Sequence, residues 1–465
     1  MYEIFHPRLA ELARTTHAEH TDFNAGRWSG ERLARHQLDG FRATVAYARQ
    51  HSTMYRARLG AIEPDEITSL SPETLARIPF TTKEDLRTYQ FDVLSKPVSK
   101  AWVYYETTGT TGVSTPAPRS LTDSLHTNMA LTLSYDTILR RFGEDQVIGI
   151  CGPSDLHATG DTFGEVCRNL GIAVAKLWPL SPLIGYERTL RVMRTLGITG
   201  LFCTPGMAMA LAAEAVAAGL DPRRDFGVKV LMLTGEVAPP SLLENIGALW
   251  GAEAHNALYG SQEASVLGAG AADGGLYLTP LINHYEVIDT DTLAPAPADA
   301  NGVRQGEMVV THLYQGSKPL VRYRTGDLVR LHPAVPGSTI PAARLEVLGR
   351  AGDRMDVNGV ETTAYDLEDR LLRHLRGYLD YRVVVDRTDG LDEIIIAFPR
   401  AYTPAQDLLE RAADESRAVF GLTPTFVFGD VTAVAGGAAK ASWKTARVVD
   451  RRTAIETILK GSQES

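Results

Sequence analysis

Between residues 146 and 260 the chain alternates short apolar runs with longer segments in which apolar positions recur at helical intervals. The runs are four to six residues long and lie close to Gly, Pro or Thr, as buried strands do. Strands and helices in alternation predict a mostly parallel sheet with helices on both faces, whose ligands bind beyond the carboxyl ends of the strands. The predicted strands are Val147–Cys151, Ile172–Leu177, Gly200–Cys203 and Val228–Leu233, and the predicted helices are Glu187–Leu196, Met207–Ala218 and Ser241–Trp250.

The pattern differs on both sides of this region. Before it, apolar positions from Glu31 to Leu59 follow helical spacing, and Thr81 with Glu84 fits a capping box that opens another helix. After Gly274 strands dominate, and Thr290–Gln305, rich in Ala, Pro, Asp and Asn, is expected to form an exposed hairpin loop. The strands predicted there are Gly275–Thr279, Tyr285–Ile288, Glu307–Leu313 and Val321–Tyr323.

From about Arg350 the chain has a small α+β pattern that is long enough to bury a core of its own. Its predicted elements are a helix at Ala364–Leu375, strands at Tyr381–Val385 and Glu393–Phe398, a helix at Ala405–Phe420 and a strand at Thr425–Phe428. We expect a domain boundary at Gly349–Asp353. The predicted fold class is α/β: residues 1–348 form a large domain, with a sheet flanked by helices and a β-rich subdomain, and residues 349–465 form a small α+β domain.

The composition of the chain excludes some classes of function. The chain has 465 residues, 44% of them hydrophobic, and a formal net charge of −9, so it lacks the basic footprint of a nucleic-acid-binding protein. It has no secretory leader pattern and no apolar stretch near the ~20 residues of a membrane helix, so we expect a cytoplasmic protein without membrane association. Cys151, Cys167 and Cys203 are widely spaced and are interpreted as small core residues rather than a zinc site or a catalytic thiol.

The segment Glu106–Pro116, with the sequence ETTGTTGVSTP, is the most informative stretch for chemistry. It holds two glycines and six hydroxyl residues in eleven positions, so its backbone N–H and side-chain OH groups can turn toward one anion such as a phosphate chain. It does not match the Walker pattern, because no Lys-Ser or Lys-Thr pair closes the loop. Taken alone, the segment fits a plain surface turn equally well.

Further motifs follow this loop in a fixed order, and together they resemble the adenylate-forming superfamily. They are Tyr259-Gly260-Ser261-Gln262-Glu263, then Tyr323-Arg324-Thr325-Gly326-Asp327, then Gly349-Arg350, and a lysine, Lys444, near the end of the chain. Two segments favour the phenylacetate–CoA ligase branch: Ile78–Arg87, with the sequence IPFTTKEDLR, and Lys444–Asp450. The resemblance extends from about Ile78 to Arg452.

The resemblance implies a role for each matched residue. It implies that ATP is bound with Mg²⁺, that Glu263 ligates the metal, and that Asp327 accepts the ribose hydroxyls. Lys444, on a mobile C-terminal domain, would stabilise the transition state in which a carboxylate attacks the α-phosphate, together with Glu263 and Thr110. The phosphate loop would be Thr107, Thr108, Gly109, Thr110, Thr111 and Gly112, and further nucleotide contacts would come from Gly235, Glu236, Tyr259, Gly260 and Arg350.

The substrate is less closely defined by the same resemblance. A small, compact aryl or arylacetic acid is expected, and coenzyme A is the default acceptor of the activated acyl group. A carrier-protein thiol or an amine as acceptor, and another small oxyanion such as nitrite as substrate, stay open, as does the choice between monomer and homodimer. The acid pocket would involve His157, Thr204, Pro205, Ala257 and Leu258, with His157 able to donate a hydrogen bond to the carboxylate.

Three positions depart from the family pattern. The phosphate loop usually continues with a lysine and a proline, whereas Val113 and Ser114 follow Gly112 here, so one charge-assisted contact is missing. Gly352 replaces the first acidic residue of the junction. The stretch Gly436–Ala439 lacks the charged residues expected ahead of Lys444. The altered loop motivates an alternative of another class, a nucleotide-binding regulator without turnover.

Overall fold

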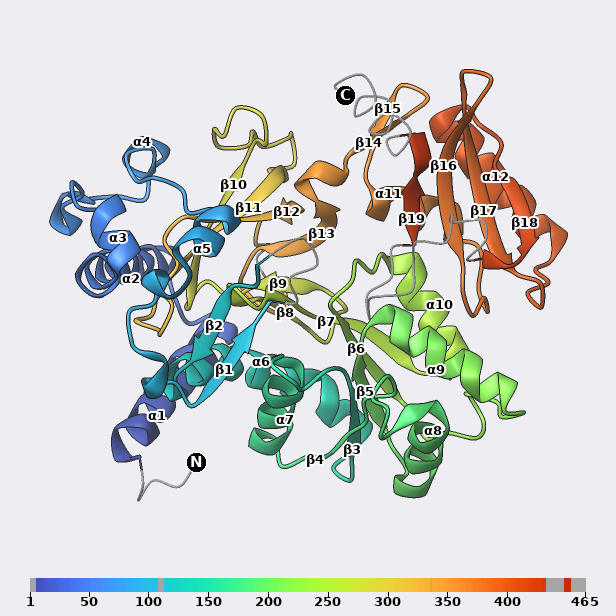
Figure 1. The fold of residues 1–465 in the computed structure, drawn as a ribbon, viewed down its shortest axis with the longest axis horizontal. Coiled ribbons are helices and arrows are strands. Elements are labelled where there is room, and N and C mark those ends of the chain that lie inside the picture. Colours follow the sequence, from blue (N-terminus) through green and yellow to red (C-terminus); the bar gives the residue numbers. More distant parts are fainter. Residues whose placement is uncertain (1–5, 108–112, 336, 432–446, 453–465) are drawn as a thin grey trace. The chain divides into compact units, whose positions relative to one another are not determined.

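The computed structural model describes residues 6–107, 113–335, 337–431 and 447–452, and its elements are labelled in Figure 1. The chain divides into two compact units. Unit 1 comprises Met1–Asp145, Pro153–Ala173 and Ala257–Val347. Unit 2 comprises Gln146–Gly152, Val174–Asn256 and Leu348–Ser465.

Unit 1 begins with the predicted helical region. Its helices are α1 (Pro7–Asn24), α2 (Gly30–His51), α3 (Thr53–Arg58), α4 (Pro72–Leu75) and α5 (Lys83–Tyr89). The capping box predicted at Thr81 and Glu84 is wrong by one residue, because Thr82 caps α5 and Asp85 closes the box. Thr81 is unavailable as a cap: its buried hydroxyl donates to the Val321 carbonyl at 2.8 Å, and its backbone pairs with the strand that follows Val321.

The sheet strands of unit 1 are mostly antiparallel and follow the order β10-β11-β12-β13-β9-β8-β7. They are β7 (Glu253–Ser261, shared with unit 2), β8 (Ser265–Gly270), β9 (Leu276–Leu278), β10 (Asn283–Ile288), β11 (Arg304–His312), β12 (Tyr323–His332) and β13 (Arg344–Arg350, whose last residues belong to unit 2). The predicted loop near Thr290–Gln305 is confirmed as the connection between β10 and β11. A hairpin, β1 (Val103–Glu106) and β2 (Pro116–Arg119), and helices α6 (Leu121–Leu139) and α7 (Thr159–Asn169) complete the unit.

One strand of unit 1 was placed incorrectly from the sequence. The predicted strand Val321–Tyr323 ends where β12 begins, so Asp327 lies inside a strand and not in a turn. The strand continues through Thr325-Gly326-Asp327 because Gly326 adopts a φ of 72° and the register with β11 shifts between Glu307 and Val309.

Unit 2 contains the predicted parallel sheet. Strands β3, β5 and β6 pair in parallel, and the order is β6-β5-β3-β4. The predictions for this region are confirmed to within a few residues: β3, β5 and β6 are buried strands, β4 is largely exposed, and the helices carry regular apolar spacing. The strands are β3 (Val147–Cys151), β4 (Ala173–Lys176), β5 (Gly200–Cys203) and β6 (Val230–Thr234), and the helices are α8 (Gly185–Leu196), α9 (Pro205–Ala217) and α10 (Pro240–Trp250).

The C-terminal part of unit 2 also has the predicted α+β pattern. Its main sheet has four strands in the order β18-β17-β16-β19. The elements are β14 (Met355–Val357), β15 (Val360–Thr362), α11 (Ala364–Leu372), β16 (Arg382–Thr388), β17 (Leu391–Pro399), α12 (Gln406–Phe420), β18 (Thr425–Gly429) and β19 (Val448–Asp450). The fold class, a large helix-flanked sheet followed by a small α+β segment, is therefore confirmed.

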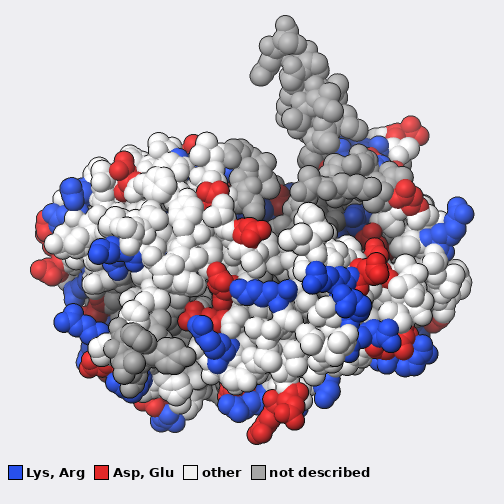
Figure 2. All heavy atoms as spheres, turned by 60° about the horizontal axis from the view of Figure 1, so that its bottom comes forward, with Lys and Arg blue, Asp and Glu red and all other residues white. Residues whose placement is uncertain are grey.

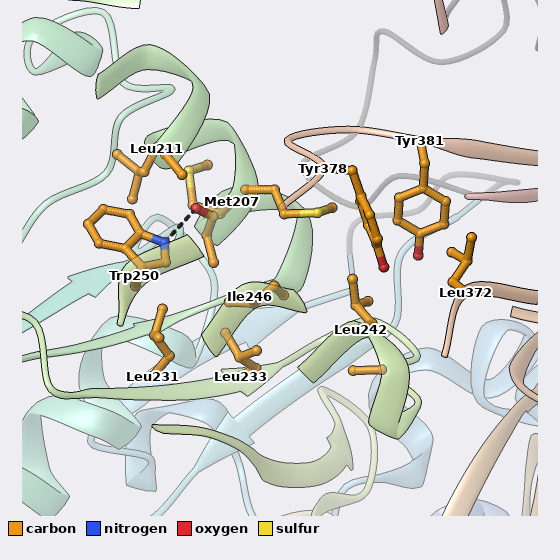
Figure 3. Close-up of a cluster of buried hydrophobic side chains, with 14 of the residues drawn as sticks. Met207, Leu211, Leu231, Leu233, Leu242, Ile246, Trp250, Leu372, Tyr378 and Tyr381 are labelled. Carbon is orange, nitrogen blue, oxygen red and sulfur yellow. Dashed lines mark hydrogen bonds between the residues drawn. The ribbon is translucent and has the colours of Figure 1, made fainter. Parts of the chain in front are cut away.

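A continuous hydrophobic core runs through unit 2 and includes residues on both sides of the predicted boundary. Figure 3 shows Leu242 and Ile246 of α10 between Trp250 on one side and Tyr378 and Tyr381 on the other. The indole N–H of Trp250 donates to the Ala208 carbonyl at 3.1 Å, which satisfies the one polar atom of this buried ring. Residues after 348 therefore pack on α10 as well as on one another, and the domain boundary at Gly349–Asp353, with its mobility, stays a prediction.

The surface and the cysteines agree with the composition. On the face drawn in Figure 2, Lys and Arg side chains are interspersed with Asp and Glu rather than gathered in one basic area. Cys151, Cys167 and Cys203 are free and buried, and burial raises the pKa of Cys151 and Cys167 to about 12, as expected for core residues. Within the described part of the chain, every helix is too short or too polar to cross a bilayer.

Three buried histidines of unit 1 make stability depend on pH. Burial lowers the pKa of His20, His284 and His312 to about 4 each. The folded protein therefore stays unprotonated at these rings while the unfolded chain takes up protons, so stability is complete above about pH 6.5 and falls as the pH drops toward 4. We expect the free energy of unfolding to decrease over this window by roughly 1.4 kcal/mol per unit of pKa difference for each ring.

The measurement is chemical unfolding at several pH values between 4 and 7. The variant His312→Phe, which keeps a ring stacked on Tyr314, should flatten the decrease, whereas changing the exposed His51 to Gln serves as the control. An identical pH slope in wild type and His312→Phe would contradict the assignment.

Candidate nucleotide site

The glycine–threonine loop forms the tip of the β1–β2 hairpin in unit 1. Residues 108–112 (Thr108, Gly109, Thr110, Thr111 and Gly112) lie outside the described residues, but the base of the loop is defined. The Thr107 and Thr115 backbones pair, and the Thr107 hydroxyl accepts a hydrogen bond from the Thr115 N–H at 3.0 Å. The antiparallel pairing of Glu106 with Pro116 continues this ladder. The predicted phosphate loop therefore lies in the sequence between two strands whose ends are paired.

Two neighbouring segments contact this hairpin. The Gln90 side chain donates to the Ser114 carbonyl at 3.1 Å and so attaches the end of α5 to the loop. On the other strand, the Glu106 N–H donates to the Leu156 carbonyl at 3.2 Å. Gln262 donates weakly to the same carbonyl at 3.4 Å, so the turn carrying His157 lies beside both the hairpin and the Glu263 motif. The His157 ring itself contacts the Thr159 hydroxyl at 2.8 Å.

Glu263, the predicted metal ligand, lies in the turn between β7 and β8. Gly260 makes the tight turn possible, because a Cβ atom there would lie 2.1 Å from the Ser265 carbonyl oxygen. The carboxylate is only 6% exposed and lies 3.0 Å from the ammonium of Lys83, the first residue of α5. Burial alone would raise the pKa of Glu263, but the charges of Lys83 and Lys318 hold it below its ordinary value. Glu263 is therefore an ionised, buried carboxylate.

Lys318 and Arg119 complete this charged cluster. The Lys318 ammonium donates to the Pro116 carbonyl at 2.9 Å, and burial lowers its pKa to about 7 against the opposing effect of Glu263. Arg119, at the end of β2, donates to the Gln262 carbonyl at 3.1 Å. Neither residue belongs to a motif that was recognised in the sequence. Their charge beside apolar residues is the feature of the sequence that could have indicated them.

Asp327, the predicted ribose ligand, is held from two sides. The Tyr259 hydroxyl donates to its carboxylate at 3.0 Å. Glu307, which is 2% exposed, accepts from the Gly326 N–H at 3.1 Å and pairs with Arg324 at 2.6 Å, so it fixes the backbone next to Asp327. Tyr259 thus joins the Asp327 carboxylate to the strand that leads into Glu263, and its predicted stacking on the nucleotide base stays a prediction.

The residues predicted to form the acid pocket are divided between the two units. In unit 1, Ala257 is fully buried and its carbonyl accepts from the Tyr135 hydroxyl at 2.8 Å, with Leu258 next to it on β7. In unit 2, Thr204 is the N-cap of α9 and accepts from the Met207 N–H, while Pro205 is the first helical residue. These acid-pocket residues belong to two units, so the pocket stays a prediction.

Two predicted nucleotide contacts of unit 2 lie beside an ionic network. Gly235 follows β6 with a φ of 85°, and the side chain of Glu236 accepts from the Gly206 N–H at 3.1 Å. Arg350 is the last residue of β13 and precedes a short 3₁₀ turn at Ala351–Asp353. Lys444 lies outside the described residues.

Arg447, three residues after Lys444, is the centre of this network. Its guanidinium binds the Glu236 carboxylate and the Val237 carbonyl, and its Nε donates to the Tyr381 hydroxyl at 2.9 Å. Glu368 lies 3.7 Å away, and all three charged side chains are at most 4% exposed. Burial raises the pKa of Glu368 while the Arg447 charge opposes this effect. The network connects β19, α11 and the end of β6.

Comparisons with known proteins agree with this arrangement. No protein-family model matches the chain. Over 383 residues it is 27% identical to a phenylacetate–coenzyme A ligase of Pseudomonas putida, covering 79% of this chain and 81% of that enzyme. A phenylacetate–coenzyme A ligase of Thermus thermophilus is 28% identical over 381 residues, covering 78% and 80%. The crystal structure of 2-hydroxyisobutyryl-CoA ligase with 2-HIB-AMP superposes with a TM-score of 0.73 at 22% identity, covering 94% of this chain and 93% of that one.

The fold is therefore that of the adenylate-forming CoA ligases. In sequence the chain is a homologue of the phenylacetate–CoA ligases at 27–28% identity, and the resemblance found from the motifs is confirmed.

The Arg447 network generates a prediction about stability. Removing one partner of a buried ion pair leaves an uncompensated charge, so Arg447→Met should lower the free energy of unfolding by about 3–5 kcal/mol, and Glu236→Gln should also destabilise. The double variant should cost less than the sum of the two. Urea unfolding measures all three, with the exposed pair Arg411 and Asp407 as the matched control, where little change is expected. Additive effects of Arg447→Met and Glu236→Gln would contradict a coupled network.

Proposed function

We propose that the protein activates a small carboxylic acid with ATP to an acyl-AMP, releasing pyrophosphate, and passes the acyl group to coenzyme A. The observation that carries this proposal is the clustering, within unit 1, of the hairpin base, the buried Glu263 carboxylate with its lysines, and the Asp327 carboxylate held by Tyr259. The similarity to phenylacetate–CoA ligases supports the reaction class.

Each of these groups has a defined task in the proposal. Backbone N–H and hydroxyl groups of the hairpin loop bind the β- and γ-phosphates, and the surrounding cations stabilise the pyrophosphate as it leaves. Asp327 accepts hydrogen bonds from the ribose hydroxyls, and Tyr259 keeps its carboxylate oriented. Lys444 supplies the positive charge for attack of the acid on the α-phosphate.

Magnesium fits the Glu263 position. This carboxylate is ionised and buried, and a bound ion would share it with the Lys83 ammonium, which lies 3.0 Å away. Magnesium is commonly held by one or two carboxylates together with substrate phosphates, so a single protein carboxylate is a sufficient donor here. When bound, the ion neutralises charge between phosphate oxygens.

The identity of the acid and of the acceptor belongs to the proposal as well. The small, uncharged Ala257 and Leu258 favour a compact aryl or arylacetic acid, whose carboxylate His157 orients by a hydrogen bond. Coenzyme A is the favoured acceptor, with a carrier-protein thiol or an amine as alternatives. Nitrite or another small oxyanion is the alternative substrate.

A nucleotide-binding regulator without turnover is the second candidate. Two observations favour it: Val113 and Ser114 replace the lysine and proline of the phosphate loop, and the Glu236 side chain next to Gly235 is bound to Arg447.

Acid-dependent exchange of labelled pyrophosphate into ATP separates the two candidates. With a panel of aryl, arylacetic and short-chain acids, we expect exchange with at least one compact aromatic acid, and Lys444→Ala should abolish most of it. Product analysis of the same samples should show AMP and not ADP. Absence of exchange with every acid, in a protein that still binds ATP, would favour the regulator.

Asp327 provides a second test, directed at the nucleotide. Asp327→Asn should raise the KM for ATP by about 10- to 100-fold, because charge-assisted hydrogen bonds are worth roughly 1.5–3 kcal/mol. Tyr259→Phe should raise it less, since only the orientation of the carboxylate is lost. Steady-state kinetics measure both, and Asp291→Asn in the exposed β10–β11 loop is the control. An unchanged KM for ATP in Asp327→Asn would refute the ribose contact.

A further inference from the structure

The Lys318 ammonium lies at the base of the β1–β2 hairpin. Its Nζ donates to the carbonyl of Pro116, the first residue of the returning strand, at 2.9 Å, and the residue is only 8% exposed. Burying an ammonium is costly unless a partner compensates its charge, so a lysine at this depth calls for an electrostatic reason.

The carboxylates around Lys318 are shared with other partners. Two further cations, Lys83 and Arg119, lie in this cluster. The carboxylates whose charges influence the pKa of Lys318 are Glu263 and Asp123. The Asp123 carboxylate is engaged elsewhere, because it accepts from the Ser120 N–H and hydroxyl and from the Ser317 N–H. The other carboxylate, Glu263, is shared between Lys318 and the Lys83 ammonium 3.0 Å away.

The hairpin loop cannot supply positive charge itself. From Glu106 to Pro116 the only ionisable side chain is that of Glu106, and the positions after the last glycine are Val113 and Ser114. A loop that binds a triphosphate through neutral N–H and OH groups alone makes no hydrogen bond from a cationic donor. Such charge-assisted hydrogen bonds are roughly twice as strong as hydrogen bonds between neutral groups. Lys318, in the segment before β12, places an ammonium on the Pro116 carbonyl at the base of the loop.

We propose that Lys318 supplies from outside the loop the positive charge that the loop lacks, and that it holds the hairpin base and Glu263 in the arrangement that binds the phosphate chain of ATP. The inference rests on the proposed function and names Lys318 as a positioning residue of the same site. It predicts that a lysine introduced into the loop should restore the phosphate binding that is lost when Lys318 is removed.

Binding of magnesium pyrophosphate and of Mg-ATP, measured by isothermal titration calorimetry, tests the inference without turnover. Lys318→Met should weaken both by about 10- to 100-fold, and Lys318→Arg should retain most of the affinity. Introducing Val113→Lys into the Lys318→Met protein should restore a large part of it, since Val113 is 66% exposed and a longer side chain fits there. Adenosine, which has no phosphates, should bind all variants equally.

The matched control is Lys96→Met. Lys96 is half-buried and donates at 3.3 Å to the carbonyl of Gln315, three residues before Lys318. It is not among the charges that act on Lys318 or Glu263, so it should not affect pyrophosphate binding. Thermal unfolding without ligand identifies variants that fail to fold. If Lys318→Met does not fold, Lys318→Arg is the test, because it keeps the charge and should keep the pyrophosphate affinity. Loss of pyrophosphate binding in folded Lys318→Arg would overturn the proposal.

Two other outcomes would also overturn it. One is unchanged pyrophosphate affinity in folded Lys318→Met, and the other is a loss that Val113→Lys does not recover, which would mean a purely structural role. Failure of the proposed function is distinguishable, because wild-type protein would then bind pyrophosphate and ATP but show no acid-dependent exchange.

Discussion

The ion pair between Glu263 and Lys83 is the interaction on which the candidate site depends. A carboxylate that is 6% exposed stays ionised only if cations compensate its burial, and α5 and the segment before β12 each contribute one lysine to do so. These cations also bring three distant parts of the sequence to one place: the start of α5, the β1–β2 hairpin and the β7–β8 turn. In the proposed function, the same charges that stabilise the folded unit also serve to bind a magnesium-bound triphosphate.

Unit 2 is held together mainly by apolar packing and one buried ionic network. Its C-terminal segment is held to α10 by an apolar core, shown in Figure 3, and to the end of β6 by the buried Arg447 network. Arg447, three residues after Lys444 in the sequence, is bound to Glu236, which follows the predicted base-binding glycine, Gly235. A rotation at Gly349–Asp353, if it separates these groups, has to break a buried ion pair and expose apolar surface.

Much of the fold follows from local pattern. Strands such as Val147–Cys151 and Gly200–Cys203 are buried on both faces, so their apolar runs identify them unambiguously, and α8 and α10 have clear amphipathic spacing. The errors occur where tertiary contacts override local signals: Thr81 bonds to Val321 instead of capping α5, and Gly326 lets β12 pass through a sequence that resembles a turn. Motif residues such as Glu263 and Asp327 could be predicted one by one, whereas Lys318 and Glu307 act through partners far away in the sequence and become visible only in three dimensions.

The central claim is that one Mg-ATP is bound by the hairpin, Glu263 and Asp327 together. A crystal structure of the protein with ATP and Mg²⁺ tests it most directly. The account predicts a Glu263 carboxylate oxygen at about 2.0–2.1 Å from the metal, the β- and γ-phosphates against the loop that begins at Thr107, and the ribose hydroxyls on Asp327. A nucleotide bound with its phosphates or its ribose away from these three groups would contradict it.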